Sequence, residues 1–238
     1  ITGKEMIDTI EIDSYVCRIY RTKEKQIQNV IFWFESVERI DIAEKMFEKL
    51  KREKGLSGFA LVVVMIKDWN KELSPWKAPA VFGSEEFLGE GEQLKNWLLK
   101  IGTAKLLKAL SVYERKPKCY IGGYSLAGLF ALWVACENDF FDGVACCSGS
   151  LWYPSWMEYA KMHIPKESTK IYLSLGKKEE KTRNAIMKTI GDCTRNLAAF
   201  YKENGQRVVL EWNNGNHFSD VAERCAKGCV WLLKEGDN

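Results

Sequence analysis

A serine at position 125 lies between small residues where the chain changes from strand-like to helix-like. Residues 121–128 read Ile-Gly-Gly-Tyr-Ser-Leu-Ala-Gly. The preceding segment 118–122 is typical of a short strand, and the wholly apolar stretch from Leu126 is typical of a helix buried against a sheet. The residues two before and two after the serine must be small at such a turn, and Gly123 and Ala127 are. The segment therefore predicts a nucleophile elbow, which lifts a serine hydroxyl toward a substrate.

A serine nucleophile needs a general base, which is usually histidine. The chain has two histidines, His163 and His217. His217 lies in a polar turn after the strand-like segment 207–212 and before a stretch with helical apolar spacing. An α/β-hydrolase places its triad in the order Ser, acid, His, with the histidine after the last strand. His217 fits that order and location, whereas His163 precedes a strand and is typical of a loop residue.

The acid of such a triad should follow the strand before the histidine loop. The strand-like segment 170–175 is followed by Gly-Lys-Lys-Glu-Glu-Lys. A carboxylate there can orient the imidazole and stabilise its charged form. We select Glu179, with Glu180 as the alternative, although the same run is also typical of a solvated charged loop. A Ser-His dyad without a strong acid remains open.

The coarse pattern is β/α alternation after an antiparallel pair that turns at Asp13-Ser14. Helices are expected over 41–54, 93–110 and 126–136. The expected strands are 6–12, 15–20, 29–34, 59–66, 118–122, 143–147, 170–175 and 208–212. Eight mainly parallel strands flanked by helices predict an α/β-hydrolase fold. With 238 residues and 46% hydrophobic content, the chain is expected to form a single domain, residues 1–238.

Composition excludes several classes of protein. The formal net charge is only +3, and lysines alternate with glutamates, so nucleic acid is not an expected partner. No window approaches the roughly 18 apolar residues of a membrane span, and the start lacks a signal-peptide pattern, so a cytoplasmic protein without a membrane partner is expected. The eight cysteines lie mostly in apolar runs without metal-ligand spacing, which predicts neither a disulfide framework nor a metal site.

A long segment rich in aromatic residues and proline, 67–90, follows the buried strand 59–66. Ligands of parallel sheets bind beyond the carboxyl ends of the strands, so this segment is expected to cover part of the site. Trp69 and Trp76 would offer flat apolar walls, joined by Trp152 and by Tyr124 beside the serine. For any one of these tryptophans taken singly, plain packing is the slightly favoured alternative.

The stretches 122–132, 141–144 and 148–152 resemble the esterase D and enterochelin-esterase-like branch of the α/β-hydrolases, and the resemblance returns at Gly176 and His217. It implies a carboxylic ester hydrolase with Ser125 as nucleophile and His217 as base. The usual His-Gly signature of the oxyanion loop is absent, and Val-Ile-Phe-Trp-Phe-Glu-Ser stands there.

The expected reaction is hydrolysis of a small-molecule ester through an acyl-enzyme on Ser125, without a cofactor. The N–H of Leu126 and one from Phe34 or Glu35 would hold the oxyanion. Cleavage of thioesters or peptides and acyl transfer would use the same apparatus. A hydrolase-like binding protein without activity is the alternative of another class.

Overall fold

The computed structural model describes residues 6–111 and 116–234, and one large sheet runs through them. Its strands are β1 (Met6–Ile12), β2 (Tyr15–Arg21), β3 (Asn29–Ser36), β4 (Phe59–Ile66), β7 (Lys118–Tyr124), β8 (Gly143–Cys147), β9 (Lys170–Gly176) and β10 (Val208–Asn213). Their order across the sheet is β1-β2-β4-β3-β7-β8-β9-β10. The six strands β4, β3, β7, β8, β9 and β10 pair in parallel in that order, whereas β2 is antiparallel to both β1 and β4. All eight predicted strands are therefore confirmed.

The first two strands form the predicted hairpin. Ile12 is paired with Tyr15, so the loop between the strands is two residues long. Asp13 has a φ of 57°, in the left-handed region that aspartate tolerates better than most residues.

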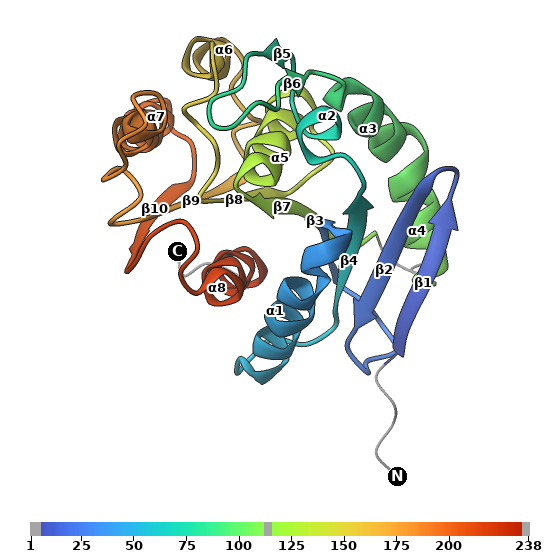
Figure 1. The fold of residues 1–238 in the computed structure, drawn as a ribbon. Helices are drawn as coiled ribbons and strands as arrows, with labels where there is room; N and C mark the ends of the chain where they lie inside the picture. The colour runs from blue at the N-terminus through green and yellow to red at the C-terminus, as the bar shows by residue number, and fades with distance from the viewer. Residues whose placement is uncertain (1–5, 112–115, 235–238) are drawn as a thin grey trace.

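Helices cover both faces of the sheet (Figure 1). One face carries α1 (Ile40–Arg52) and α8 (Val221–Leu233). The other carries α3 (Gly91–Trp97), α4 (Thr103–Ala109), α5 (Leu126–Glu137), α6 (Trp156–Met162) and α7 (Ile190–Glu203). Single turns of helix occupy Val37–Arg39 and Met187–Thr189. No helix in the described ranges is both long and apolar enough to cross a membrane.

Apolar patterning explains these positions. Every residue of β4 is buried, as its run of apolar residues between two strands requires. Helix α1 buries Ala43, Met46, Phe47 and Leu50, the spacing of one helical face, whereas α5 is apolar on all sides and lies deep in the core.

The expected single helix over residues 93–110 is interrupted. A π-helical segment, Leu98–Gly102, separates α3 from α4. The Trp97 ring lies over Gly102, where an added Cβ would stand 3.0 Å from it, so the glycine leaves room for the indole. The sequence does not predict helices α6 and α7, because neither segment has a continuous apolar run like that of α5.

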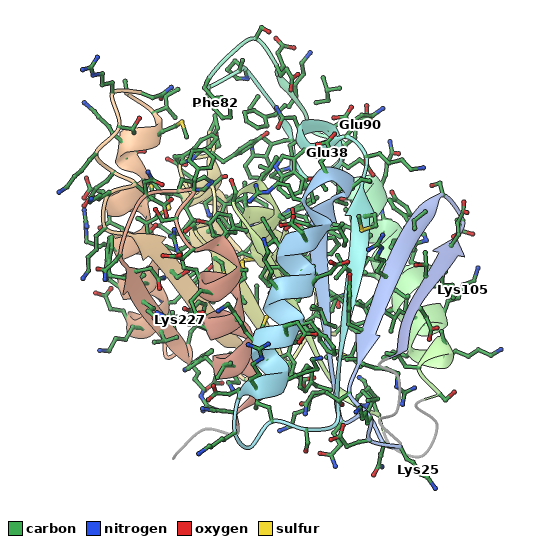
Figure 2. All side chains as sticks on the ribbon, turned by 60° about the horizontal axis from the view of Figure 1, so that its bottom comes forward. Lys25, Glu38, Phe82, Glu90, Lys105 and Lys227 are labelled. Atoms are coloured by element: carbon green, nitrogen blue, oxygen red, sulfur yellow. The ribbon has the colours of Figure 1, made fainter. Side chains whose placement is uncertain are left out.

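The carboxyl ends of the parallel strands meet at one edge of the sheet. The segment 67–90, which leaves β4 there, contains the short helix α2 (Trp69–Glu72) and a small hairpin of β5 (Lys77–Ala78) and β6 (Phe87–Leu88). Figure 2 shows Glu38 and Phe82 at this edge and Lys25 at the opposite one. Loops from β3, β4, β7, β8, β9 and β10 therefore converge on a common region.

Candidate active site

Ser125 stands at the junction of β7 and α5 in a strained backbone conformation. Its φ is 61° and its ψ is −124°, a combination rare for residues with a side chain. The turn brings strand and helix so close that a Cβ added to Gly123 would lie 2.5 Å from the carbonyl carbon of Ala127. The Ser125 N–H donates to the Cys147 carbonyl on β8 at 3.0 Å. This geometry is that of the predicted elbow.

His217 reaches the serine from the loop after β10. Its Nε2 lies 3.0 Å from the Ser125 hydroxyl oxygen. The Tyr124 hydroxyl donates to the His217 carbonyl at 2.8 Å, and the two rings lie 5.1 Å apart. Tyr124 is buried, so it supports the histidine loop and does not line the cavity beside Ser125 that is described below.

Glu179 completes a chain of three residues. Its Oε2 lies 2.7 Å from His217 Nδ1, and its Oε1 accepts hydrogen bonds from the Gly176 N–H and the Ser148 hydroxyl, both at 2.8 Å. Burial by itself would raise the pKa of Glu179. The bonds and charge of His217, together with Arg224 and Ser148, outweigh that effect and hold the pKa below its usual range. Glu179 is therefore a carboxylate at neutral pH.

Arg224, on α8, is a site residue that the sequence did not reveal. Its side chain is buried, and Nη2 donates to both Glu179 Oε1 and the Ser148 hydroxyl. Its Nη1 donates to the Asn216 carbonyl at 2.8 Å and to that of Ser219 at 3.3 Å. One guanidinium thus joins the acid loop to the histidine loop. The available signal was an arginine on the apolar face of a helix, which requires a buried partner.

Glu180, the alternative acid, lies outside this arrangement. Its Oε2 accepts from Arg195 Nη2 at 2.7 Å, and the pair is partly exposed. The structure therefore brings Glu179, and not its neighbour, to the histidine.

A cavity of about 600 Å³ opens over Ser125 and His217. Its other walls come from Arg39, Phe82, Ser148, Gly149, Trp152, Lys178, Glu179, Lys181, Thr182, Met187, Ile190, Asn216 and Phe218. Of the tryptophans expected to contact substrate, Trp152 lines this cavity. The segment 67–90 contributes Phe82 to it.

Trp69 and Trp76 do not line the cavity, because both serve the packing of their own segment. The Trp76 indole N–H donates to the Pro154 carbonyl at 2.9 Å, and the ring stacks on Trp156 at a centroid distance of 6.4 Å. Trp69 begins α2 and packs against the core.

The expected oxyanion donors have different surroundings. Leu126 begins α5, where the first N–H groups have no partner within the helix. Phe34 lies within β3, in register with both β4 and β7, and its buried ring packs on Phe130 at 4.9 Å. Neither Phe34 nor Glu35 lines the cavity, so a second donor from this pair remains a prediction.

Glu35 is a buried acid beside the site. Its Oε1 accepts from the Ser36 N–H at 3.1 Å. Burial raises the pKa of Glu35 to about 7, partly opposed by the charge of Arg39 and by the Ser36 N–H.

In the described residues, no group of three or more His, Cys, Asp or Glu side chains could hold a metal ion.

Comparisons with known proteins bear on both sequence and fold. Residues 5–217 match the family described as "Putative esterase". The sequence matches no curated protein. The siderophore hydrolase EstA from Aspergillus nidulans has a similar structure, with a TM-score of 0.73, 15% identity, and coverage of 98% of this chain and 95% of that one.

Two further solved structures are similar. An IroE-like serine hydrolase from Shewanella oneidensis gives a TM-score of 0.79 at 11% identity, covering 98% of this chain and 82% of that one. The enterobactin esterase FES from Shigella flexneri gives 0.64 at 16% identity, covering 98% and 60%. At such identities the likeness concerns the fold, and the predicted α/β-hydrolase architecture is confirmed.

Proposed function

Since the chain belongs to the esterase family whose match spans residues 5–217, we propose that it hydrolyses carboxylic esters through an acyl-enzyme on Ser125. Membership also agrees with the resemblance stated from the sequence. The observation that carries the proposal is the chain of hydrogen bonds from Ser125 through His217 to Glu179, at 3.0 and 2.7 Å. Distances of this size are within reach for proton transfer.

In the first step the Ser125 oxygen attacks the ester carbonyl while His217 Nε2 takes the hydroxyl proton. Glu179 accepts a hydrogen bond from the Nδ1–H of the imidazole, which fixes the tautomer that leaves Nε2 free as a base. The charged ring is then stabilised by a carboxylate that Arg224 and Ser148 keep ionised. The tetrahedral intermediate places its negative charge near the start of α5, where the Leu126 N–H is the expected donor.

Collapse of that intermediate passes the proton from His217 to the departing alcohol and leaves the acyl group on Ser125. Water enters the cavity, gives a proton to His217 and attacks the acyl carbonyl. The second tetrahedral intermediate then breaks its bond to the Ser125 oxygen, which takes the proton back from His217, and the acid product is released. Every proton transfer in this cycle uses side chains of the chain itself.

The expected substrate is a small-molecule ester. A cavity of about 600 Å³ is of a size that encloses such a ligand. The names of similar structures mention siderophore and enterobactin hydrolysis, so esters of that kind are reasonable first candidates for this chain.

The test is labelling with a fluorophosphonate, read as intact mass, together with turnover of a 4-nitrophenyl ester. We expect one adduct on the unaltered protein and none on Ser125→Ala or His217→Ala. His163→Ala is the matched control, because that exposed ring, just after α6, bonds to the Tyr159 carbonyl and stacks on the Tyr159 ring and does not line the cavity. A protein that neither labels nor turns over ester would contradict the proposal and favour a hydrolase-like binding protein.

A further inference from the structure

The cavity over Ser125 is lined by three cationic side chains for which the described residues provide no ion pair. Arg39, Lys178 and Lys181 all line it. Within residues 6–111 and 116–234, none of the three side chains has an ion pair or a hydrogen bond. Arg39 is half-buried, and its acidic neighbour Glu35 has a pKa of about 7, so the guanidinium loses part of its hydration without gaining a fully ionised partner.

Three carboxylates at or near the cavity are engaged by other partners. Glu179, the lining carboxylate, bonds to His217 and Arg224. Glu180 pairs with Arg195 at 2.7 Å, and Asp41 pairs with Lys45 at 2.9 Å. These three acids are paired with other bases, whereas Arg39, Lys178 and Lys181 form no ion pair among the described residues, which is the arrangement expected where a ligand supplies the negative charge.

Aromatic side chains stand exposed at the same cavity. Phe82 is 65% exposed and Phe218 is 80% exposed, and both line it together with the half-buried Trp152. Large apolar side chains exposed together at a cavity commonly mark a binding surface.

Contacts of neighbouring residues help to position both phenylalanines. The Phe218 ring meets the His217 ring edge-on at 5.5 Å. Next to Phe82, the Val81 carbonyl accepts from Asn184 Nδ2 at 2.6 Å, which ties the segment 67–90 to the chain before α7. The apolar walls are therefore positioned for a flat group of a ligand.

We infer that this cavity selects esters that combine a flat apolar group with a negatively charged group, and that Arg39 is the residue that recognises the charge. The inference rests on the proposed function, because it assigns a substrate class to the same site. A planar guanidinium binds carboxylate or phosphate oxygens in pairs, and partial burial strengthens that contact. Lys178 and Lys181 add a field that attracts the anion without fixing its orientation.

Matched ester pairs test the inference. The acyl-side pair is the 4-nitrophenyl monoester of glutaric acid against its neutral methyl diester. The leaving-group pair is 4-acetoxybenzoate against its methyl ester, with 4-acetoxyphenyl phosphate separating phosphate from carboxylate. Each kcat/KM is divided by the alkaline hydrolysis rate of the same ester, which removes differences in intrinsic reactivity.

We expect the anionic member of at least one pair to be preferred about tenfold or more, the range of a charge-assisted hydrogen bond. The preference should fall toward unity in Arg39→Gln, survive in part in Arg39→Lys, and weaken as salt is raised. Lys105→Gln is the control, since that exposed cation on α4 lies away from the cavity (Figure 2) and should leave the ratio unchanged.

Equal turnover of both members in every pair would overturn the inference while leaving the esterase proposal intact. A preference that Arg39→Gln leaves unchanged would also overturn it. Absence of turnover for all esters would instead count against the proposed function, so the two failures are distinguishable.

Discussion

At the scale of single residues, the paired glutamates after β9 provide a direct test of the triad. Glu179→Gln keeps the shape of the side chain but removes the charge that stabilises protonated His217. We expect kcat to fall by about 10³ to 10⁴, as for the loss of a triad carboxylate elsewhere. Glu180→Gln is the matched control and should stay within about twofold of the unaltered protein, because it only loosens an exposed ion pair with Arg195.

Kinetics with a 4-nitrophenyl ester would decide between these glutamates. Similar losses in the two variants, or a loss in Glu180→Gln alone, would contradict the assignment of Glu179 as the acid.

The sequence predicted the nucleophile and base because both rest on local patterns. Ser125 has a motif, and His217 is one of only two histidines. The acid could be narrowed to a loop but not chosen there, because two adjacent glutamates have the same chemistry until the backbone aims one inward. Arg224 could not be found from the sequence, since its role depends on its contact with Glu179, 45 positions away. Phe82 could not be found either, because its role depends on the shape of the cavity.

At the scale of elements, helix α8 joins the two loops that carry the histidine and the acid. Its Arg224 bonds to Glu179 and to the carbonyls of Asn216 and Ser219. In Arg224→Met, Glu179 stays buried but loses a charged donor, so its pKa should rise. As the pH is lowered, Glu179 then becomes protonated at a higher pH than in the unaltered protein. The acid limb of the kcat/KM profile should therefore move upward in pH. Breaking a buried pair should also lower the free energy of unfolding by about 3–5 kcal/mol.

A pH profile of kcat/KM and urea unfolding measure both effects. Lys227→Met, one turn further along α8, is the control, since among the described residues Lys227 bonds to Glu211 and Asn213 and not to Glu179 or the histidine loop. Arg224→Lys keeps a charge if the methionine variant folds poorly, and it should restore part of the original profile. An unmoved acid limb in Arg224→Met would show that α8 does not set the state of the acid.

Elements with strong apolar patterns were predicted well, and those with weak patterns were not. Strand β4 and helix α5 are apolar throughout and could hardly be placed elsewhere than in the core. Helices α6 and α7 and the π-helical segment 98–102 depend on packing against neighbours distant in sequence, such as the contact of Trp97 with Gly102.

At the scale of the whole molecule, the order of the strands explains how residues far apart in sequence meet. Parallel pairing of β3, β7, β8, β9 and β10 brings Arg39, Ser125, Ser148, Glu179 and His217 to one edge, although the sequence spreads them over most of the chain. The sequence predicted, from the fold class, that the site lies at the carboxyl ends of the parallel strands. It could not predict which side chains of the edge remain without partners, because that depends on every neighbouring loop.

Burial of Glu35 makes the stability of the whole molecule depend on pH. Its pKa is about 7 in the folded chain, against an ordinary value of 4.5. Between these values the folded chain retains a proton that the unfolded chain has lost, so the free energy of unfolding falls as pH rises through this window and levels off above it. The difference corresponds to at most about 3 kcal/mol.

Glu35→Gln removes this titration while its amide oxygen can still accept the Ser36 N–H. We therefore expect the variant to gain stability relative to the unaltered protein as pH rises from 5 to 8, measured by urea unfolding at each pH. Glu38→Gln, an exposed neighbour in the same segment, should show no such growing difference. A Glu35→Gln difference that stays constant over this range would mean that Glu35 is already ionised in the folded protein. Its charge would then be held by Arg39 and the Ser36 N–H.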